Sequence, residues 1–212
     1  MITGFFSIRS NKEDNMALTV ENLKCPNCGA ALAIDNKICK YCHNPVTITS
    51  FHSIADMPAP KVNKYASLSK KKLEDDPENQ ELNFSLGTCY LKLKLYDKAL
   101  AAFEIAMEDN FDNSETFFCA AMCLLQGKKP FLHNRQTINK IQEYINAALM
   151  IEERGIYYYF LAYIKKDYFE RKYLNVSPNF AETMQTANSH GVSEADKKIL
   201  FDMLGVERPA EM

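Results

Sequence analysis

The chain has 212 residues, 47% of them hydrophobic and 25% charged, a composition typical of a soluble globular protein with enough apolar material for a core. Its formal net charge of −2 gives no global positive excess of the kind that draws proteins to nucleic acid or anionic lipid. No apolar run approaches the roughly 18 residues that a membrane helix needs. We therefore expect a cytoplasmic protein with no membrane partner.

The first residues, MITGFFSIRSNKEDN, have too short an apolar stretch for a signal peptide and no small-residue cleavage site. Met16 follows this polar run, so residues 1–15 are either a flexible leader or sequence upstream of a later start. We expect a flexible leader over residues 1–20 and assign it no secondary structure.

Four of the seven cysteines fall in the stretch CPNCGAALAIDNKICKYC, with the spacing C-x2-C-x10-C-x2-C. Two residues between paired cysteines let both thiolates of one tight turn face the same cation, and two such turns supply four soft ligands in a tetrahedron. The pattern predicts one structural Zn²⁺, because four protein ligands leave no position open for water or substrate. A disulfide or a redox C-x2-C pair is the alternative. The predicted ligands are Cys25, Cys28, Cys39 and Cys42.

The residues between the two cysteine pairs predict a β-hairpin. AALAIDNKI is consistent with two short strands around the turn dipeptide Asp35-Asn36. Gly29 suits the position after the second cysteine, where the chain turns closely around the sulfur. His43 takes the corresponding place after Cys42, and we expect it in solvent rather than as a competing ligand. So small a module cannot bury enough surface to fold without a metal or a partner.

The cysteine motif resembles the short zinc ribbons at the N-termini of many bacterial proteins, with the pattern CPxCG…C-x-Y-C, over about residues 23–48. The resemblance implies a zinc-held hairpin used as an interaction surface for protein, DNA or RNA. We assign residues 21–48 to this module. Residues 49–61 contain Pro58 and Pro60 and little periodicity, which favours a linker.

Residues 80–113 have the spacing of a helical hairpin. Three small residues, Gly87, Ala99 and Ala106, let two antiparallel helices approach closely, while Tyr90 and Phe103 fill the space between neighbours. Together with Leu86, these positions match the tetratricopeptide pattern W-x2-L-G-x2-Y followed by A-x3-F-x2-A. The match departs at two positions, Asn83 in place of Trp and Phe111 in place of Pro.

Weaker units flank this repeat. A preceding helix is expected at about residues 62–75, a second unit from Ser114 with a lengthened turn, and a third from Gly155. Two short helices, near 179–188 and 193–204, complete the chain. Ser193 and Asp196 resemble a capping box, and Gly205 can end the last helix.

The resemblance to tetratricopeptide proteins covers about residues 62–175 and implies a mainly α fold. We expect a helical-hairpin solenoid over residues 62–212, with C-terminal capping helices and the zinc ribbon in front of it. In this family the first helix of each unit lines a concave groove that binds peptides or partner proteins. The alternative is that these side chains pack against the chain's own C-terminal helices. The implied groove residues are Phe84, Thr88, Leu91, Phe118, Met122, Tyr159 and Tyr163.

No catalytic constellation or glycine-rich phosphate loop stands out. We expect Cys89, Cys119 and Cys123 to be small core residues, and the tyrosines of residues 157–168 to pack between helices. The sequence thus favours a non-enzymatic adaptor that binds one or more proteins or peptide segments. The alternative is a nucleic-acid-associated factor whose ribbon contacts DNA or RNA.

Overall fold

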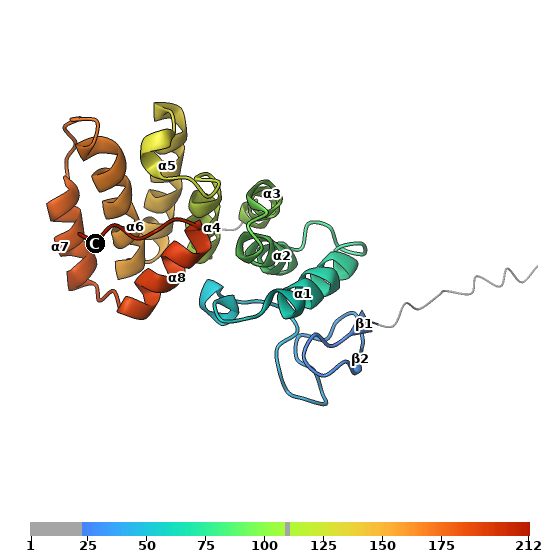
Figure 1. Cartoon of the computed structure of the whole chain (residues 1–212). Coiled ribbons are helices and arrows are strands. Elements are labelled where there is room, and N and C mark those ends of the chain that lie inside the picture. The colour runs from blue at the N-terminus through green and yellow to red at the C-terminus, as the bar shows by residue number, and fades with distance from the viewer. Residues whose placement is uncertain (1–22, 109–110) are drawn as a thin grey trace, which may run out of the picture.

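The computed structural model describes residues 23–108 and 111–212, so the predicted leader at residues 1–20 lies outside the described part. An antiparallel pair of strands opens this part, and helices make up most of the rest (Figure 1). The expected class, mainly α with a small N-terminal hairpin module, is confirmed. The elements in order are β1 (Leu23–Lys24), β2 (Ala31–Leu32), the 3-10 helix η1 (Phe51–Ile54), α1 (Ala59–Lys72), α2 (Gln80–Lys92), α3 (Tyr96–Met107), α4 (Ser114–Cys123), the 3-10 helix η2 (Pro130–Leu132), α5 (Arg135–Ile151), α6 (Gly155–Ile164), the π-helical turn η3 (Lys165–Glu170), α7 (Phe180–Ser189) and α8 (Glu194–Leu204).

The helices form a tetratricopeptide-like (TPR-like) array of hairpins. Each helix from α1 to α6 packs against the next one in the chain, and α8 returns to contact α4 and α6. Asn79 caps the start of α2 by accepting a hydrogen bond from the backbone N–H of Leu82. At Gly87, a Cβ atom would lie only 2.8 Å from the Phe103 ring, which confirms the close approach expected between α2 and α3.

The two C-terminal helices begin where their caps predict. Asn179 with Glu182 starts α7, and Ser193 with Asp196 starts α8, each pair forming a complete capping box. Gly205 ends α8 in the left-handed conformation, at φ +70°. These short helices therefore have strong local signals; α7 packs against the preceding helix α6, whereas α8 also reaches back to α4.

The strand pairing of the ribbon differs from the expectation. The two strands were expected on either side of Asp35-Asn36, but β1 pairs with β2 across the first cysteine turn, with Leu23 opposite Leu32. Residues 33–36 do form a turn, closed by a 3.1 Å hydrogen bond from the Ala33 N–H to the Asn36 side chain. The strands pair across the cysteine turn because the backbone hydrogen bonds of this turn bring residues 25 and 30 together.

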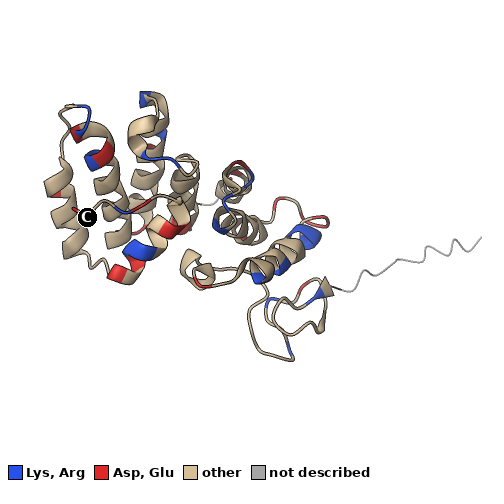
Figure 2. Cartoon of the chain, in the orientation of Figure 1, with Lys and Arg blue, Asp and Glu red and all other residues tan. Residues whose placement is uncertain are grey.

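The segment expected to be a linker is packed into the molecule. It contains η1, whose Phe51 and Ile54 side chains are completely buried, and α1 begins at Ala59 rather than near residue 62. Pro58 is the N-cap of α1, and Pro60 lies in its first turn, where a proline costs no helical hydrogen bond. Charges of both signs lie on α2, α3, α5 and α8, whereas α1 carries lysines without acidic residues (Figure 2).

Candidate metal centre and partner-binding face

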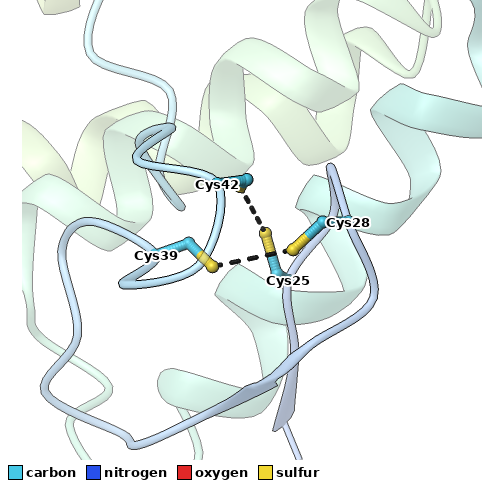
Figure 3. A group of neighbouring side chains, drawn as sticks. All are labelled: Cys25, Cys28, Cys39 and Cys42. Carbon is cyan, nitrogen blue, oxygen red and sulfur yellow. Dashed lines mark hydrogen bonds between the residues drawn. The ribbon is translucent and has the colours of Figure 1, made fainter.

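The structure brings the four predicted cysteine ligands together in the ribbon (Figure 3). Their sulfur atoms all lie within 4.8 Å of one another. The Cys25–Cys42 and Cys28–Cys39 sulfur pairs are each 3.7 Å apart, and all four thiols are free. A disulfide needs about 2.05 Å between sulfurs, so the arrangement is not a pair of disulfides.

Each cysteine pair sits in a turn of the same design. The Gly29 N–H donates to the Cys25 carbonyl at 2.9 Å, and the His43 N–H donates to the Cys39 carbonyl at 2.8 Å. Both Gly29 and His43 adopt a left-handed backbone, with φ of +77° and +57°. His43 therefore takes a conformation that favours glycine, and its side chain is exposed, as expected.

Backbone amides around the second turn favour the thiolate form. The N–H groups of Cys42 and Tyr41 lower the pKa of the Cys39 thiol. The backbone N–H and the side chain of Asn44 lower the pKa of the Cys42 thiol to about 6. Because a thiolate and not a thiol binds metal, these donors prepare the turn for a cation.

Two of the sulfur–sulfur distances match those around a tetrahedral zinc ion. Zn–S bonds of about 2.3 Å place the sulfurs of a regular tetrahedron about 3.8 Å apart, close to the two distances of 3.7 Å. The four cysteines could hold one metal ion, and with four protein ligands a tetrahedral ion would have no open coordination position.

The ribbon is fixed directly to α1. Tyr65 of α1 accepts a 2.8 Å hydrogen bond from the Asn27 amide and donates its hydroxyl to the Pro45 carbonyl at 3.1 Å. Leu68 completes the small apolar core of the ribbon, and Lys72 donates to the Asn36 carbonyl at 2.7 Å. The ribbon is thus joined to the array by packing rather than held at a distance by an extended linker.

The residues predicted to line the partner groove are all buried. Two segments of the same chain cover them: Phe51 of η1 lies 5.4 Å from Phe118, and Phe201 of α8 lies 5.1 Å from Tyr163, between ring centroids. The alternative of packing against the C-terminal helices agrees with this burial, and η1 adds a cover that the sequence did not indicate. The seven are Phe84, Thr88, Leu91, Phe118, Met122, Tyr159 and Tyr163. In this structure a partner could reach these residues only after the covering segments move.

Polar contacts hold the N-terminal cover in place. The Ile48 N–H donates to the Ser85 hydroxyl at 2.9 Å, and the Phe51 N–H donates to the Glu115 carboxylate at 3.0 Å. Glu115 is also paired with Arg154 at 2.7 Å. Sequence reasoning missed these contacts because single polar residues on unrelated helices carry no spacing signal.

A close polar contact joins the two covering segments. The His52 Nε2 lies 2.7 Å from the Asp196 carboxylate, linking η1 to the first turn of α8. Burial opposes ionisation of Asp196, but hydrogen bonds from His52 and Ser193 hold the pKa of its carboxyl below the ordinary value. The two covering segments, η1 and α8, are therefore connected to each other although they lie 144 residues apart at this contact.

The remaining cysteines and tyrosines are core residues, as expected. Cys89, Cys119 and Cys123 are buried, and burial raises the pKa of the Cys89 thiol to about 12, which keeps it protonated. Among the tyrosines of residues 157–168, Tyr158 alone is only partly buried, while the others pack inside the array.

No protein-family model matches the chain, and no curated protein matches it. A solved structure titled "MamA MSR-1 C2" is similar at 17% sequence identity, with a TM-score of 0.44, over 70% of this chain and 84% of that chain. At this level the similarity carries no conclusion about binding or activity, and the helical-hairpin architecture rests on the chain's own contacts. Within the described residues, no helix combines the length and apolar character needed to cross a bilayer.

Proposed function

We propose that this protein is a non-enzymatic adaptor in which one structural Zn²⁺ holds the N-terminal ribbon and the helical array carries surfaces for partner proteins. The observation that carries the proposal is the set of four cysteine sulfurs gathered within 4.8 Å of one another, on a ribbon packed against the first helix of a TPR-like array. The zinc would link the two cysteine turns and supply no reaction, because four thiolates complete its coordination.

The burial of the predicted groove changes where such an adaptor would bind. Phe51 and Ile54 are completely buried, so displacing η1 would expose a large apolar area before any partner contact forms. We therefore place partner recognition on the outer surfaces of the ribbon and the helices, or on a groove opened by a partner that replaces η1. The original seven groove residues remain candidates only for the second case.

The metal part of the proposal is tested by native mass spectrometry of the full-length protein. We expect one zinc per chain, lost in Cys39→Ser and retained in Cys89→Ser, which removes a buried thiol outside the cluster. A protein that carries no metal, or that keeps its zinc in Cys39→Ser, would contradict the proposed centre.

The adaptor part is tested by purifying the tagged protein from its own host with and without nuclease treatment, followed by quantitative mass spectrometry. Partner proteins that survive nuclease and are recovered in stoichiometric amounts support an adaptor. Recovery of nucleic acid, with every associated protein lost on nuclease treatment, would favour the alternative of a nucleic-acid-associated factor.

A further inference from the structure

A cleft of about 540 Å³ lies where the ribbon meets α1. Its floor is apolar and consists of the buried residues Leu23, Pro26 and Leu68. Its rim carries Lys24 from β1 and Lys64 from α1, both exposed. The cleft is therefore formed by the same contact that fixes the ribbon on the array, and its shape depends on both.

The rim is a local concentration of positive charge on a chain whose net charge is −2. The sequence of α1, APKVNKYASLSKKK, contains five lysines and no acidic residue. Lys64 shares a helix face with Ser67 and Leu68, which also line the cleft. In the described part of the chain, Lys24 and Lys64 make no ion pair, whereas Lys37 and Lys197 each pair with a glutamate.

We propose that this cleft binds a peptide segment in which one large apolar side chain is flanked by aspartate or glutamate. The inference deepens the proposed adaptor function and rests on it. The apolar side chain would fill the space above Leu23 and Leu68, and the flanking carboxylates would pair with the two rim lysines. The apolar floor is complementary to the large apolar side chain of such a peptide, and Lys24 and Lys64 are complementary to its carboxylates.

The charge of the metal centre sets the orientation. Cys25 lines the ribbon side of the cleft, and four thiolates with one Zn²⁺ carry a formal charge of −2. A carboxylate of the partner beside Lys64, on the α1 side, should therefore bind more strongly than one beside Lys24, which directly precedes Cys25. The acidic residues of the partner should accordingly contribute more to its affinity on the α1 side of the apolar side chain than on the ribbon side.

The lining of the cleft favours an acidic peptide over a nucleic acid or an anionic lipid surface. The cleft lining described here contains no aromatic side chain on which a base could stack, and no arginine to grip a phosphate in two places. A flat lipid surface would touch the rim lysines but leave the recessed floor unfilled. An acidic peptide with an apolar anchor is the ligand that uses both features.

The test starts from full-length, zinc-loaded protein panned against a phage library of random peptides. The enriched peptides should share one Leu, Ile, Phe or Met next to Asp or Glu. A dye-labelled copy of the best peptide is then titrated by fluorescence anisotropy against the wild type, K24E/K64E and S67W, which places a large side chain in the cleft. The control is K128E/K129E, the same charge change at exposed lysines before η2.

We expect K24E/K64E to weaken the peptide about tenfold and K128E/K129E to change its affinity less than about twofold. S67W should remove binding, with zinc content and helical circular dichroism unchanged in all variants. Enriched peptides without acidic residues, or equal affinity in the wild type, K24E/K64E and S67W, would overturn the proposal.

Two further arms separate other ligands. A labelled single-stranded oligonucleotide and phosphatidylserine vesicles are measured beside the peptide. Binding of either that is lost in K24E/K64E, with no acidic peptide enriched, would replace the peptide by a polyanion and overturn the proposal. If K24E/K64E keeps every protein partner recovered from the host, the cleft proposal fails while the adaptor function stands.

Discussion

The ribbon and the helical array are stabilised in different ways. The buried apolar core of the ribbon consists of a few residues, including two of the cysteines, and one member, Leu68, comes from α1. The array has a continuous core that runs from η1 through α8. A module with so small a core depends on its metal and its neighbour, whereas the array can be stable through apolar burial alone.

Because the ribbon and the array are stabilised differently, we expect a change in one of them to leave the stability of the other nearly unaffected. Damage to the array core should lower its free energy of unfolding without releasing zinc. Changes in the cysteine turns should alter zinc affinity without altering the unfolding of the array. The two regions touch where Tyr65, Leu68 and Lys72 of α1 contact the ribbon, and where Lys37 of the ribbon pairs with Glu81 of α2 at 2.6 Å.

The largest effect is expected for Phe51→Ala, which removes a completely buried ring from its contact with Phe118. It should lower the free energy of unfolding of the array by about 3–5 kcal/mol, measured by urea titration of the helical signal, with zinc content unchanged. The control is Phe111→Ala. The Phe111 side chain is 70% exposed, so this substitution should change the free energy of unfolding by less than about 0.5 kcal/mol. Equal effects of the two substitutions would show that η1 is not part of the core.

A smaller loss is expected for Gly87→Ala. The added Cβ would lie 2.8 Å from the Phe103 ring, so α2 and α3 must move apart or the ring must turn, at about 1–3 kcal/mol. Combining it with Phe103→Leu should give less than the sum of the two single losses, because the smaller side chain relieves the overlap. Strict additivity in urea unfolding would contradict this contact.

Asp196→Asn should lower array stability by about 1 kcal/mol near neutral pH, because it removes the partner of His52 and weakens the cap of α8. The folded pKa of Asp196 is depressed, so its contribution is complete above the unfolded pKa of about 4 and is lost as pH falls through the folded value. Unfolding measured below about pH 4 should therefore show a loss in the wild type that Asp196→Asn lacks. Asp202→Asn, on the same helix, serves as the control and should keep the acid-dependent loss.

The smallest effects are expected at the equivalent turn positions of the ribbon, and with opposite signs. His43→Gly removes a side chain from a left-handed backbone and should tighten zinc binding, measured by competition with a chelator. Gly29→Ala adds a methyl group at φ +77° with no atom within 4 Å, so only backbone strain should weaken binding. Each change should be about fivefold or less. A change of the same sign in both variants would mean that side-chain contacts, rather than backbone conformation, decide the effect.

Local signals in the sequence predicted much of this structure. Spacing alone predicted that the four cysteines gather, because a C-x2-C turn fixes the positions of its sulfurs. The small residue Gly87 opposite Phe103 predicted the α2–α3 hairpin, and the capping residues Ser193 and Asp196 predicted the start of α8. In each case the residues that decide the structure lie close together in the chain or follow a regular period.

The cover of the predicted groove could not be anticipated in the same way. Phe51 and Ile54 stand in a short polar and proline-containing stretch without a period, so their burial depends on Phe118 and its neighbours in the distant helix α4. The ribbon strands are two residues each, too short for an alternating pattern to show. Tertiary contacts decide the burial of η1, whereas the backbone hydrogen bonds of the cysteine turn decide the strand pairing.

The most direct test of the zinc-held adaptor is hydrogen exchange, measured by mass spectrometry on zinc-loaded and chelator-treated full-length protein. The account predicts that chelation removes protection from residues 25–46 and from the ribbon-facing turns of α1, while the amides of α2 to α8 keep theirs. Unchanged protection in the ribbon, or loss of protection throughout the array, would contradict the claim that the metal holds the ribbon and burial holds the helices.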